Sequence, residues 1–320
     1  MTSPDPMTHD PDRADAGAPL DCLIVGGGPA GLSAAIYLGR FHRRVAVVDN
    51  DEGRMRMIPR SHNHPGYPEG VAGVNLLEDM REQARRYGAT LIGGKVTAIR
   101  REGDLFVADS DTGRFTARTI MLGTGVVNHR PPLDEDAHAQ AVAQGLLRYC
   151  PICDAYEQTG TRIGVLGSDR HGLAEAVFLR SYSRDITLIA LTGVRLDQDA
   201  RAQANAARIK VVETPISALN FDNGCVQVTL ENGEELIFDT LYVALGSHTR
   251  NELGQMLGID LEDGQCFVTD EHQRTSIPGV YAAGDAVEGL DQIGFAIGTG
   301  TRAAVAIHND LRDKEGHTLD

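Results

Sequence analysis

This 320-residue chain has little positive charge and no long hydrophobic run. It contains 30 Lys and Arg against 45 Asp and Glu, which gives a net charge of −15. A surface that binds nucleic-acid phosphates needs an excess of Lys and Arg, so this balance argues against a nucleic-acid partner. No apolar run approaches the ~20 residues that cross a bilayer, so no membrane partner is expected either.

Paired cysteines are also scarce. Five cysteines in a chain of this length are an odd number and do not form a disulfide scaffold. Residues 1–19 are polar, acidic and proline-rich, with no apolar stretch that could serve as a secretory signal. We therefore expect a disordered N-terminal extension on a cytoplasmic protein.

What the chain does contain is typical of a globular α/β protein. The hydrophobic content is 42%, and 36 glycines allow many tight turns. The length is sufficient for two domains, each with its own core.

An internal repeat indicates how these domains are built. The loops GGGPAG (26 to 31) and GSDRHG (167 to 172) each lie between a strand-like and a helix-like run, at an offset of 141 residues. The same offset relates the following strands, VAVVD (45 to 49) and ITLIA (186 to 190). Each copy is therefore predicted to be a βαβ unit.

Each copy continues in the same way. Segments 96–125 and 216–246 alternate apolar and polar residues around turns and end on an apolar strand, which predicts a β-meander and a returning parallel strand. A strand and helix at 275–311 have no counterpart in the first copy, so we expect them to complete the first domain. The predicted fold is α/β, with two Rossmann-like βαβ domains, each with a β-meander. The second domain (131–247) is expected to be inserted in the first (20–130 and 248–320).

The first glycine loop predicts a dinucleotide site. In the pattern Gly-x-Gly-x-x-Gly, Gly26 permits a tight turn, Gly28 permits close approach of a pyrophosphate, and Gly31 lets the helix pack on the strand. The helix N-terminus then presents free N–H groups to the diphosphate. Asp49, at the end of the second strand, is placed to bond ribose hydroxyls.

Four motifs resemble those of the low-molecular-weight thioredoxin reductases, in the same order and spacing, over about residues 21–311. They are VGGGPAGLSAAIYLGR, NHPGYPEGVAG (63 to 73), CPICD (150 to 154) and TSIPGVYAAGDAV (275 to 287). The resemblance implies a homodimer, FAD in the first domain, and an NAD(P)-binding-like second domain that carries a redox-active cysteine pair. The predicted cofactor-binding residues are Gly26, Gly28, Pro29, Ala30, Gly31, Asp49, Asn63, Val96, Thr124, Gly125, Gly284, Asp285, Gln292 and Ile293.

Cys150 and Cys153 form a C-x-x-C motif, for which three interpretations compete. A zinc site would need two more ligands at metal spacing, and Cys225 and Cys266 supply no such pair. An inert structural pair and a redox-active disulfide remain, and the flavin fold favours the latter. The resemblance implies that Cys153 exchanges electrons with the flavin, that Cys150 attacks the substrate disulfide, and that Asp154 exchanges protons with the thiolates. Helix capping is the alternative role for Asp154.

The second glycine loop departs from the fingerprint at its centre, where Asp169 corresponds to Gly28. Two unit charges ~4 Å apart repel by about 4 kcal/mol at an effective dielectric of about 20, so a carboxylate there opposes a pyrophosphate. Ala190, which corresponds to Asp49, has no group for a ribose. The family's His-Arg-Arg run for the 2′-phosphate is replaced by a stretch with only Arg195. The sequence therefore predicts that ordinary NADPH binding has been lost.

The functional prediction is an FAD-dependent thiol-disulfide oxidoreductase with a donor other than NADPH. Its partner would be a thioredoxin-like protein or a small disulfide or dithiol. Electrons would come from a ferredoxin-like donor, or from a substrate dithiol on their way to oxygen. Dithiol oxidases tend to have His where this chain has Asp154, which favours the first version. A conventional NADPH-thioredoxin reductase and a non-enzymatic redox sensor are the alternatives.

Two other features have less specific meaning. His62 and His64 flank Asn63 and are expected to be loop histidines in solvent, with proton transfer near the flavin as the alternative. A basic cluster extends from Arg40 to Arg60 in this acidic chain, and it is interpreted either as a solvated face or as a docking patch.

Overall fold

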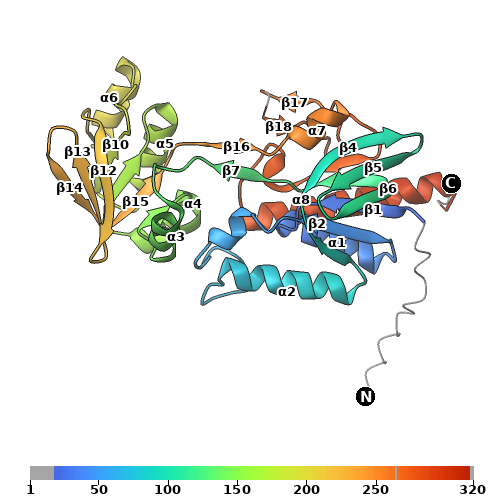
Figure 1. The fold of residues 1–320 in the computed structure, drawn as a ribbon. Helices are drawn as coiled ribbons and strands as arrows, with labels where there is room; N and C mark the ends of the chain where they lie inside the picture. Colours follow the sequence, from blue (N-terminus) through green and yellow to red (C-terminus); the bar gives the residue numbers. More distant parts are fainter. Residues whose placement is uncertain (1–17, 264, 318–320) are drawn as a thin grey trace. The chain divides into compact units, whose positions relative to one another are not determined.

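The computed structural model describes residues 18–263 and 265–317, so residues 1–17 of the predicted extension lie outside the described residues. The chain divides into two compact units, and Figure 1 follows their elements along the sequence. The first unit contains the described residues up to Gly53, then Leu77–Gly125, then those from Thr249 onward. The second unit contains Arg54–Leu76 and Val126–His248. The domain boundaries expected near residues 130 and 248 remain a prediction, and Arg54–Leu76 belongs to the second unit.

The first unit is built on one mixed sheet, in the order β3-β2-β1-β6-β5-β4, with β19 also paired to β6. Its strands are β1 (Leu20–Val25), β2 (Val45–Asp49), β3 (Thr90–Gly93), β4 (Val96–Glu102), β5 (Leu105–Ser110), β6 (Gly113–Leu122) and β19 (Val280–Ala282). β1 and β2 are almost wholly apolar and buried, as is expected of parallel strands covered on both faces.

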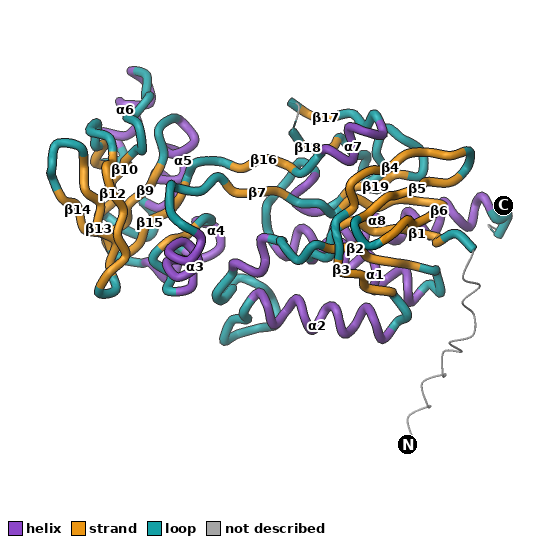
Figure 2. The backbone as a smooth tube through the Cα atoms, in the orientation of Figure 1, coloured by secondary structure: helices purple, strands orange, loops and turns teal. Residues whose placement is uncertain are grey.

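Strand β6 has two roles that the sequence assigned to separate strands. Its first half pairs antiparallel with β5, and its second half pairs parallel with β1. The third meander strand and the returning strand are therefore continuous in this unit. β19 then pairs parallel with β6 through Val280 and Ile120, so the C-terminal segment does extend the first sheet. Figure 2 shows β4, β5 and β6 as neighbours in this sheet.

Helix α1 (Pro29–Arg40) follows β1, and α8 (Ile293–Lys314) packs against it. A Cβ added to Gly300 of α8 would collide with the backbone carbonyl of Ala30, so the two helix backbones approach closely. The remaining elements are α7 (Glu252–Leu257), β17 (Leu261–Glu262), β18 (Cys266–Phe267), the 3₁₀ turn η4 (Gly284–Ala286) and α2 (Gly73–Arg86). The residues of α2 up to Leu76 belong to the second unit.

The second unit repeats the plan with a parallel sheet, in the order β11-β10-β9-β15-β8, and a separate antiparallel meander, β12-β13-β14. Its sheet strands are β8 (Leu147–Arg148), β9 (Arg162–Leu166), β10 (Asp185–Ile189), β11 (Lys210–Val211) and β15 (Thr240–Val243). The meander strands are β12 (Ile216–Asp222), β13 (Cys225–Leu230) and β14 (Glu235–Phe238). Here the third meander strand and the returning strand are distinct, as the sequence predicted.

The helical elements of this unit are η2 (Arg54–Met57), α3 (Glu135–Ala143), α4 (Pro151–Asp154), η3 (Tyr156–Gln158), α5 (Arg170–Leu179) and α6 (Gln198–Ala206). Strands β7 (Val126–Asn128) and β16 (Ser247–Thr249) pair as a ribbon at the ends of the unit's long segment. The predicted α/β fold with two Rossmann-like βαβ modules is confirmed. Among residues 18–263 and 265–317, no helix has the length and apolar character that crossing a bilayer requires.

Candidate active site

The first glycine loop leaves open space at the start of α1. A Cβ on Gly31 would collide with the carbonyl oxygen of Gly26, so the first and third glycines pack directly on each other. Gly28 is the N-cap of α1 and provides no side-chain cap, and a Cβ added to it would meet nothing within 4 Å. This cradle fits a diphosphate facing the N–H groups of the helix.

Asp49 lies beside this loop. A Cβ added to Gly27 would be 2.8 Å from the Asp49 carboxylate carbon, which places the acid directly against the loop. Arg81 of α2 reaches Asp49 Oδ2 at 3.4 Å and Asp51 Oδ1 at 2.6 Å. The carboxylate therefore fits the predicted contact with a ribose.

The Gly-Asp turn of η4 lies against the same helix end. Gly284 has φ +75°, and a Cβ added to it would be 2.9 Å from the Cβ of Ala30. Its N–H donates to Thr299 Oγ1 of α8 at 3.0 Å. Gln292 is the N-cap of α8, and Ile293 is its first residue. The structure thus brings the first loop and the Gly284–Asp285 turn together.

Four further residues were predicted to bind the cofactor, and one of them, Thr124, also lies at the first loop, since its backbone N would be 3.4 Å from a Cβ added to Gly26. Thr124 donates its hydroxyl to the Arg250 carbonyl at 2.7 Å, and the Gly125 carbonyl accepts from the Arg250 N–H. The side chain of Val96 is buried in the core, at the start of β4. Asn63 belongs to the second unit, where its amide donates to the Ile152 carbonyl at 3.4 Å.

The second loop keeps the outer glycines, but its centre is occupied. A Cβ on Gly167 would be 2.7 Å from Gly172 Cα, so these two glycines pack as their counterparts do. Asp169 is the N-cap of α5, and its Oδ1 accepts hydrogen bonds from the N–H groups of His171 (3.0 Å) and Gly172 (3.3 Å). The carboxylate thereby takes the N–H groups that would otherwise face a phosphate. Helix α5 starts at Arg170, directly after this cap.

The segment after β10 adds to this obstruction. The Arg195 N–H donates to the Ser168 carbonyl at 2.5 Å, which joins the segment to the loop. Arg170, which follows Asp169, forms an ion pair with Asp197 at 2.6 Å. Ala190 is 1% exposed. Neither the loop nor the strand end presents the groups that the fingerprint requires.

Cys150 and Cys153 form a disulfide. Cys150 is the N-cap of the short helix α4, and its carbonyl accepts from the Cys153 N–H at 3.0 Å. The other cysteines, Cys22, Cys225 and Cys266, are free. In the part of the chain that the structure describes, no group of three or more His, Cys, Asp or Glu could hold a metal ion.

Asp154 follows the disulfide as the last residue of α4, and both of its carboxylate oxygens are bonded. Arg148 Nη1 donates to Oδ2 at 2.5 Å, and the Tyr242 hydroxyl donates to Oδ1 at 2.7 Å. Burial raises the pKa of Asp154 above its ordinary value, while the charge of Arg148 and both hydrogen bonds oppose that rise. Burial also raises the pKa of Tyr242, so this hydroxyl remains a donor.

Comparisons with known proteins agree with this arrangement. The family model for pyridine nucleotide-disulphide oxidoreductases matches residues 20–300. The chain belongs to this family. It is 30% identical to a thioredoxin reductase of Mycolicibacterium smegmatis, over 92% of this chain and 97% of the relative. It is 27% identical to a 34.2 kDa protein in the rubredoxin operon of Clostridium pasteurianum, over 89% and 95% of the two chains. The solved structure of HlmI superposes with a TM-score of 0.86 at 28% identity, over 93% and 94% of the two chains.

Within the family, the chain is a flavin-dependent disulfide oxidoreductase of the thioredoxin reductase type. The resemblance drawn from the four motifs is therefore confirmed. Sequence reasoning missed two residues of the site, Arg148 and Tyr242. Arg148 lies two residues before Cys150, but Tyr242 lies 88 residues from Asp154 and no local signal connects them.

The loop histidines and the basic cluster have less specific surroundings. His64 Nδ1 is buried and has no hydrogen-bond partner among the described residues, and burial lowers the pKa of this imidazole. Arg43 bonds Glu315 within the first unit, and Arg60 bonds the Glu69 carbonyl within the second. The predicted basic cluster is thus divided between the two units.

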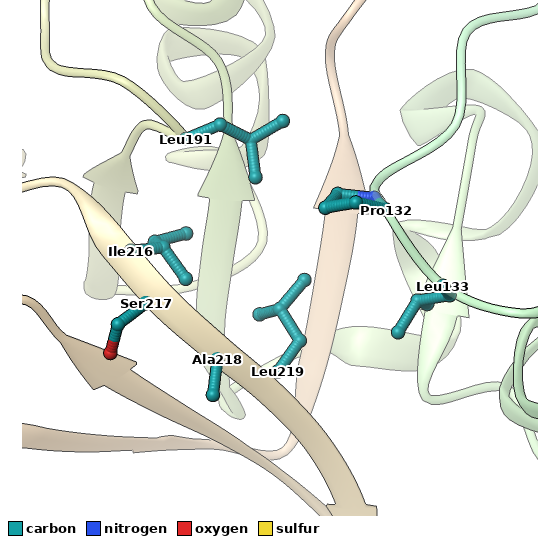
Figure 3. Close-up of a pocket in the computed structure, with 7 residues that line it drawn as sticks. All are labelled: Pro132, Leu133, Leu191, Ile216, Ser217, Ala218 and Leu219. Carbon is teal, nitrogen blue, oxygen red and sulfur yellow. The ribbon is translucent and has the colours of Figure 1, made fainter.

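The second unit also contains a cavity of about 270 Å³. Figure 3 shows Pro132 and Leu133 on one side of it and the first residues of β12 on the other. Leu191, the residue after Ala190, completes a lining that is mainly apolar. The lining includes no residue of the cysteine pair or of the second glycine loop.

Proposed function

We propose that this protein is an FAD-dependent thiol-disulfide oxidoreductase whose electron donor is not NADPH. Electrons would pass between the flavin, the Cys150–Cys153 disulfide and a thioredoxin-like protein or a small disulfide or dithiol. The observation that carries this proposal is the second glycine loop, where Asp169 bonds the helix N–H groups that a nicotinamide dinucleotide would need.

The first loop supports FAD as the cofactor. Gly28 leaves the start of α1 open, Asp49 lies against the loop, and Gly284 packs on Ala30 beside it. These residues would hold the diphosphate and a ribose. When bound, FAD supplies electron transfer in one- or two-electron steps.

The second unit supplies the thiol chemistry. Opening the Cys150–Cys153 disulfide takes two electrons and two protons and yields two thiols. By family resemblance Cys150 reacts with the substrate disulfide, Cys153 exchanges electrons with the flavin, and the Asp154 carboxylate takes up and returns protons. The protein would act as a homodimer, as the resemblance implies.

The donor that we favour is a small one-electron carrier such as a ferredoxin. A relative in a rubredoxin operon agrees with a partner of this kind. Dithiol oxidases tend to have His at the position of Asp154. The acid therefore favours electron flow from such a carrier to the disulfide over oxidation of a dithiol with transfer of its electrons to oxygen.

Anaerobic reduction of the purified protein tests the proposal. The flavin absorbance is followed after mixing with NADPH, with a dithiol and with chemically reduced ferredoxin in separate experiments. We expect reduced ferredoxin or the dithiol to bleach the flavin, and we expect NADPH to bleach it only slowly. Rapid bleaching by NADPH would identify a conventional NADPH-thioredoxin reductase. A reducible flavin that never exchanges electrons with a dithiol or disulfide would identify a sensor without turnover.

A further inference from the structure

The Asp154 carboxylate is enclosed by donors from elements distant in sequence. Arg148 reaches it from β8, and Tyr242 reaches it from β15, the neighbouring strand of the same parallel sheet. The side chains of Arg148 and Asp154 are 18% and 24% exposed, so this ion pair is largely shielded from water. A pair in such surroundings is screened little by salt.

The guanidinium of Arg148 is itself held in place. Its Nε donates to Thr240 Oγ1 at 3.2 Å, and Thr240 Oγ1 lies 3.1 Å from the Gly145 carbonyl oxygen that accepts its proton. Tyr242 is completely buried, which fixes its hydroxyl at the end of a rigid strand. Both donors point at Asp154.

These contacts select one protonation form of the acid. Arginine nitrogens donate hydrogen bonds and accept none, and the Tyr242 hydroxyl donates to the other oxygen, so both contacts favour the ionised carboxylate. The charge of Glu157 opposes ionisation of Asp154. After burial, the charge of Arg148 is the largest influence on Asp154, and it acts in favour of the ionised form.

We propose that Arg148 and Tyr242 are positioning residues that keep Asp154 in its ionised, proton-accepting form next to the cysteine pair. In doing so they set the pH range over which the Cys150–Cys153 disulfide exchanges with dithiols. This inference rests on the proposed function, because it assumes that Asp154 handles the protons of that exchange.

The exchange balances without any other reactant. A substrate dithiol loses two protons and forms an S–S bond, while the Cys150–Cys153 bond breaks and the two sulfurs take up two protons. An ionised Asp154 accepts a proton as the attacking dithiol becomes a thiolate, and it returns the proton to the leaving cysteine sulfur. A neutral Asp154 has no site for the incoming proton while Arg148 and Tyr242 bond its oxygens.

The test measures the rate at which dithiothreitol opens the disulfide, without oxygen and over about pH 5 to 9, where thiols and a perturbed carboxyl titrate. Samples are quenched with an alkylating reagent and weighed by mass spectrometry, so the readout needs neither the flavin nor an electron donor. The variants are Arg148→Met, Arg148→Lys, Tyr242→Phe and Asp154→Asn. Arg162→Met is the matched control, since it removes an exposed ion pair of the same unit.

We expect an inflection in the wild-type profile that Asp154→Asn removes and that Arg148→Met moves upward by about 1–2 pH units, the usual effect of losing an adjacent opposite charge. Tyr242→Phe and Arg148→Lys should give smaller upward shifts, because each keeps part of the bonding. Arg162→Met should match the wild type. If Arg148→Met unfolds, the profiles of Arg148→Lys and Tyr242→Phe still show whether these two residues set the pH range of the exchange.

Profiles of the Arg148 and Tyr242 variants that superimpose on the wild type would overturn the inference alone and leave the proposed function intact. An Asp154→Asn profile equal to the wild type would remove the proton role of Asp154, and this inference with it. A disulfide that dithiothreitol does not open in any variant would contradict the proposed function itself.

Discussion

The carboxylate of Asp169 accepts a hydrogen bond from the backbone N–H of Gly172 at 3.3 Å. In the first loop the position of Asp169 is taken by Gly28, which has no side chain and leaves the helix end open. The two copies of the module therefore use the same helix start differently. One leaves it available to a ligand, and the other uses it to stabilise the helix.

The first prediction concerns a substitution that gives the first loop the central acid of the second loop. Gly28→Asp should greatly reduce retention of FAD, because the new carboxylate would enter the open space at the start of α1 and bond its N–H groups. The flavin content per chain, measured from absorbance after purification, checks this expectation. Folding should be preserved, since a Cβ at this position meets nothing within 4 Å.

Gly298→Asp is the matched control for this substitution. Gly298 lies exposed on α8 in the same unit, and a Cβ added to it also meets nothing within 4 Å. That variant should retain flavin as the wild type does. Full flavin loading of Gly28→Asp would contradict the phosphate cradle, and it would also remove the argument drawn from Asp169.

A second prediction concerns the cysteine pair. Air-oxidised, denatured protein should expose three alkylatable thiols, those of Cys22, Cys225 and Cys266, and reduced protein should expose all five. In Cys153→Ser, the remaining Cys150 should form a mixed disulfide with a small aromatic disulfide faster than the remaining Cys153 does in Cys150→Ser. This order follows from the proposed roles. Cys225→Ser, which changes a free cysteine outside the pair, is the control, and equal rates in the two pair variants would argue against the assigned roles.

The sequence predicted the glycine frame and the βαβ repeat because both depend on local spacing. Gly26 and Gly31 must pack together wherever a strand turns tightly into a helix, and the sequence shows both. The surroundings of Asp154 could not be predicted in the same way, since Tyr242 reaches it through the order of strands in a sheet. Asp169 carried a local signal of a different kind, because an acid directly before a helix is a common N-cap.

A third prediction uses pH. Glu315 accepts hydrogen bonds from Arg43 (2.7 Å) and Arg118 (2.5 Å). These bonds lower the pKa of Glu315 from 4.5 to about 2, and the bond from Arg43 has the largest effect. Because the folded pKa lies below the unfolded value, the stabilisation is complete above about pH 4.5 and is lost as the pH falls toward 2. Glu315→Gln should lower the free energy of unfolding by about 1–2 kcal/mol at neutral pH. The difference from the wild type should shrink steadily under acid, as measured by urea unfolding at several pH values.

Glu82→Gln serves as the comparison for Glu315→Gln. Glu82 pairs with Arg86 on an exposed helix face, where the two side chains are 65% and 69% exposed. Removing such a pair should change stability by no more than about 0.5 kcal/mol. If Glu315→Gln had as small an effect, or one that did not depend on pH, the cluster around Glu315 would not contribute as described.

The last prediction returns to the second loop. Asp169→Gly should leave the protein folded, since glycine is a tolerated N-cap that costs only a few tenths of a kcal/mol. Millimolar NADPH should nevertheless reduce the flavin of both the wild type and this variant far more slowly than ~10 per second, a usual enzyme turnover. Removing the acid does not open the bond between Arg195 and Ser168, and it adds no group for the ribose.

The strand end limits any simple restoration of the site. Ala190 is 1% exposed, so Ala190→Glu would bury a carboxylate and destabilise the unit before it could bind a ribose hydroxyl. The double variant with Asp169→Gly should therefore unfold at lower urea concentration and gain no reduction by NADH. Stopped-flow absorbance under anaerobic conditions measures the reduction, with dithiothreitol as the positive control for a reducible flavin. Rapid bleaching of the wild type by NADPH would show that the capped loop still admits the dinucleotide, and Asp169 would then be a structural cap without consequence for the donor.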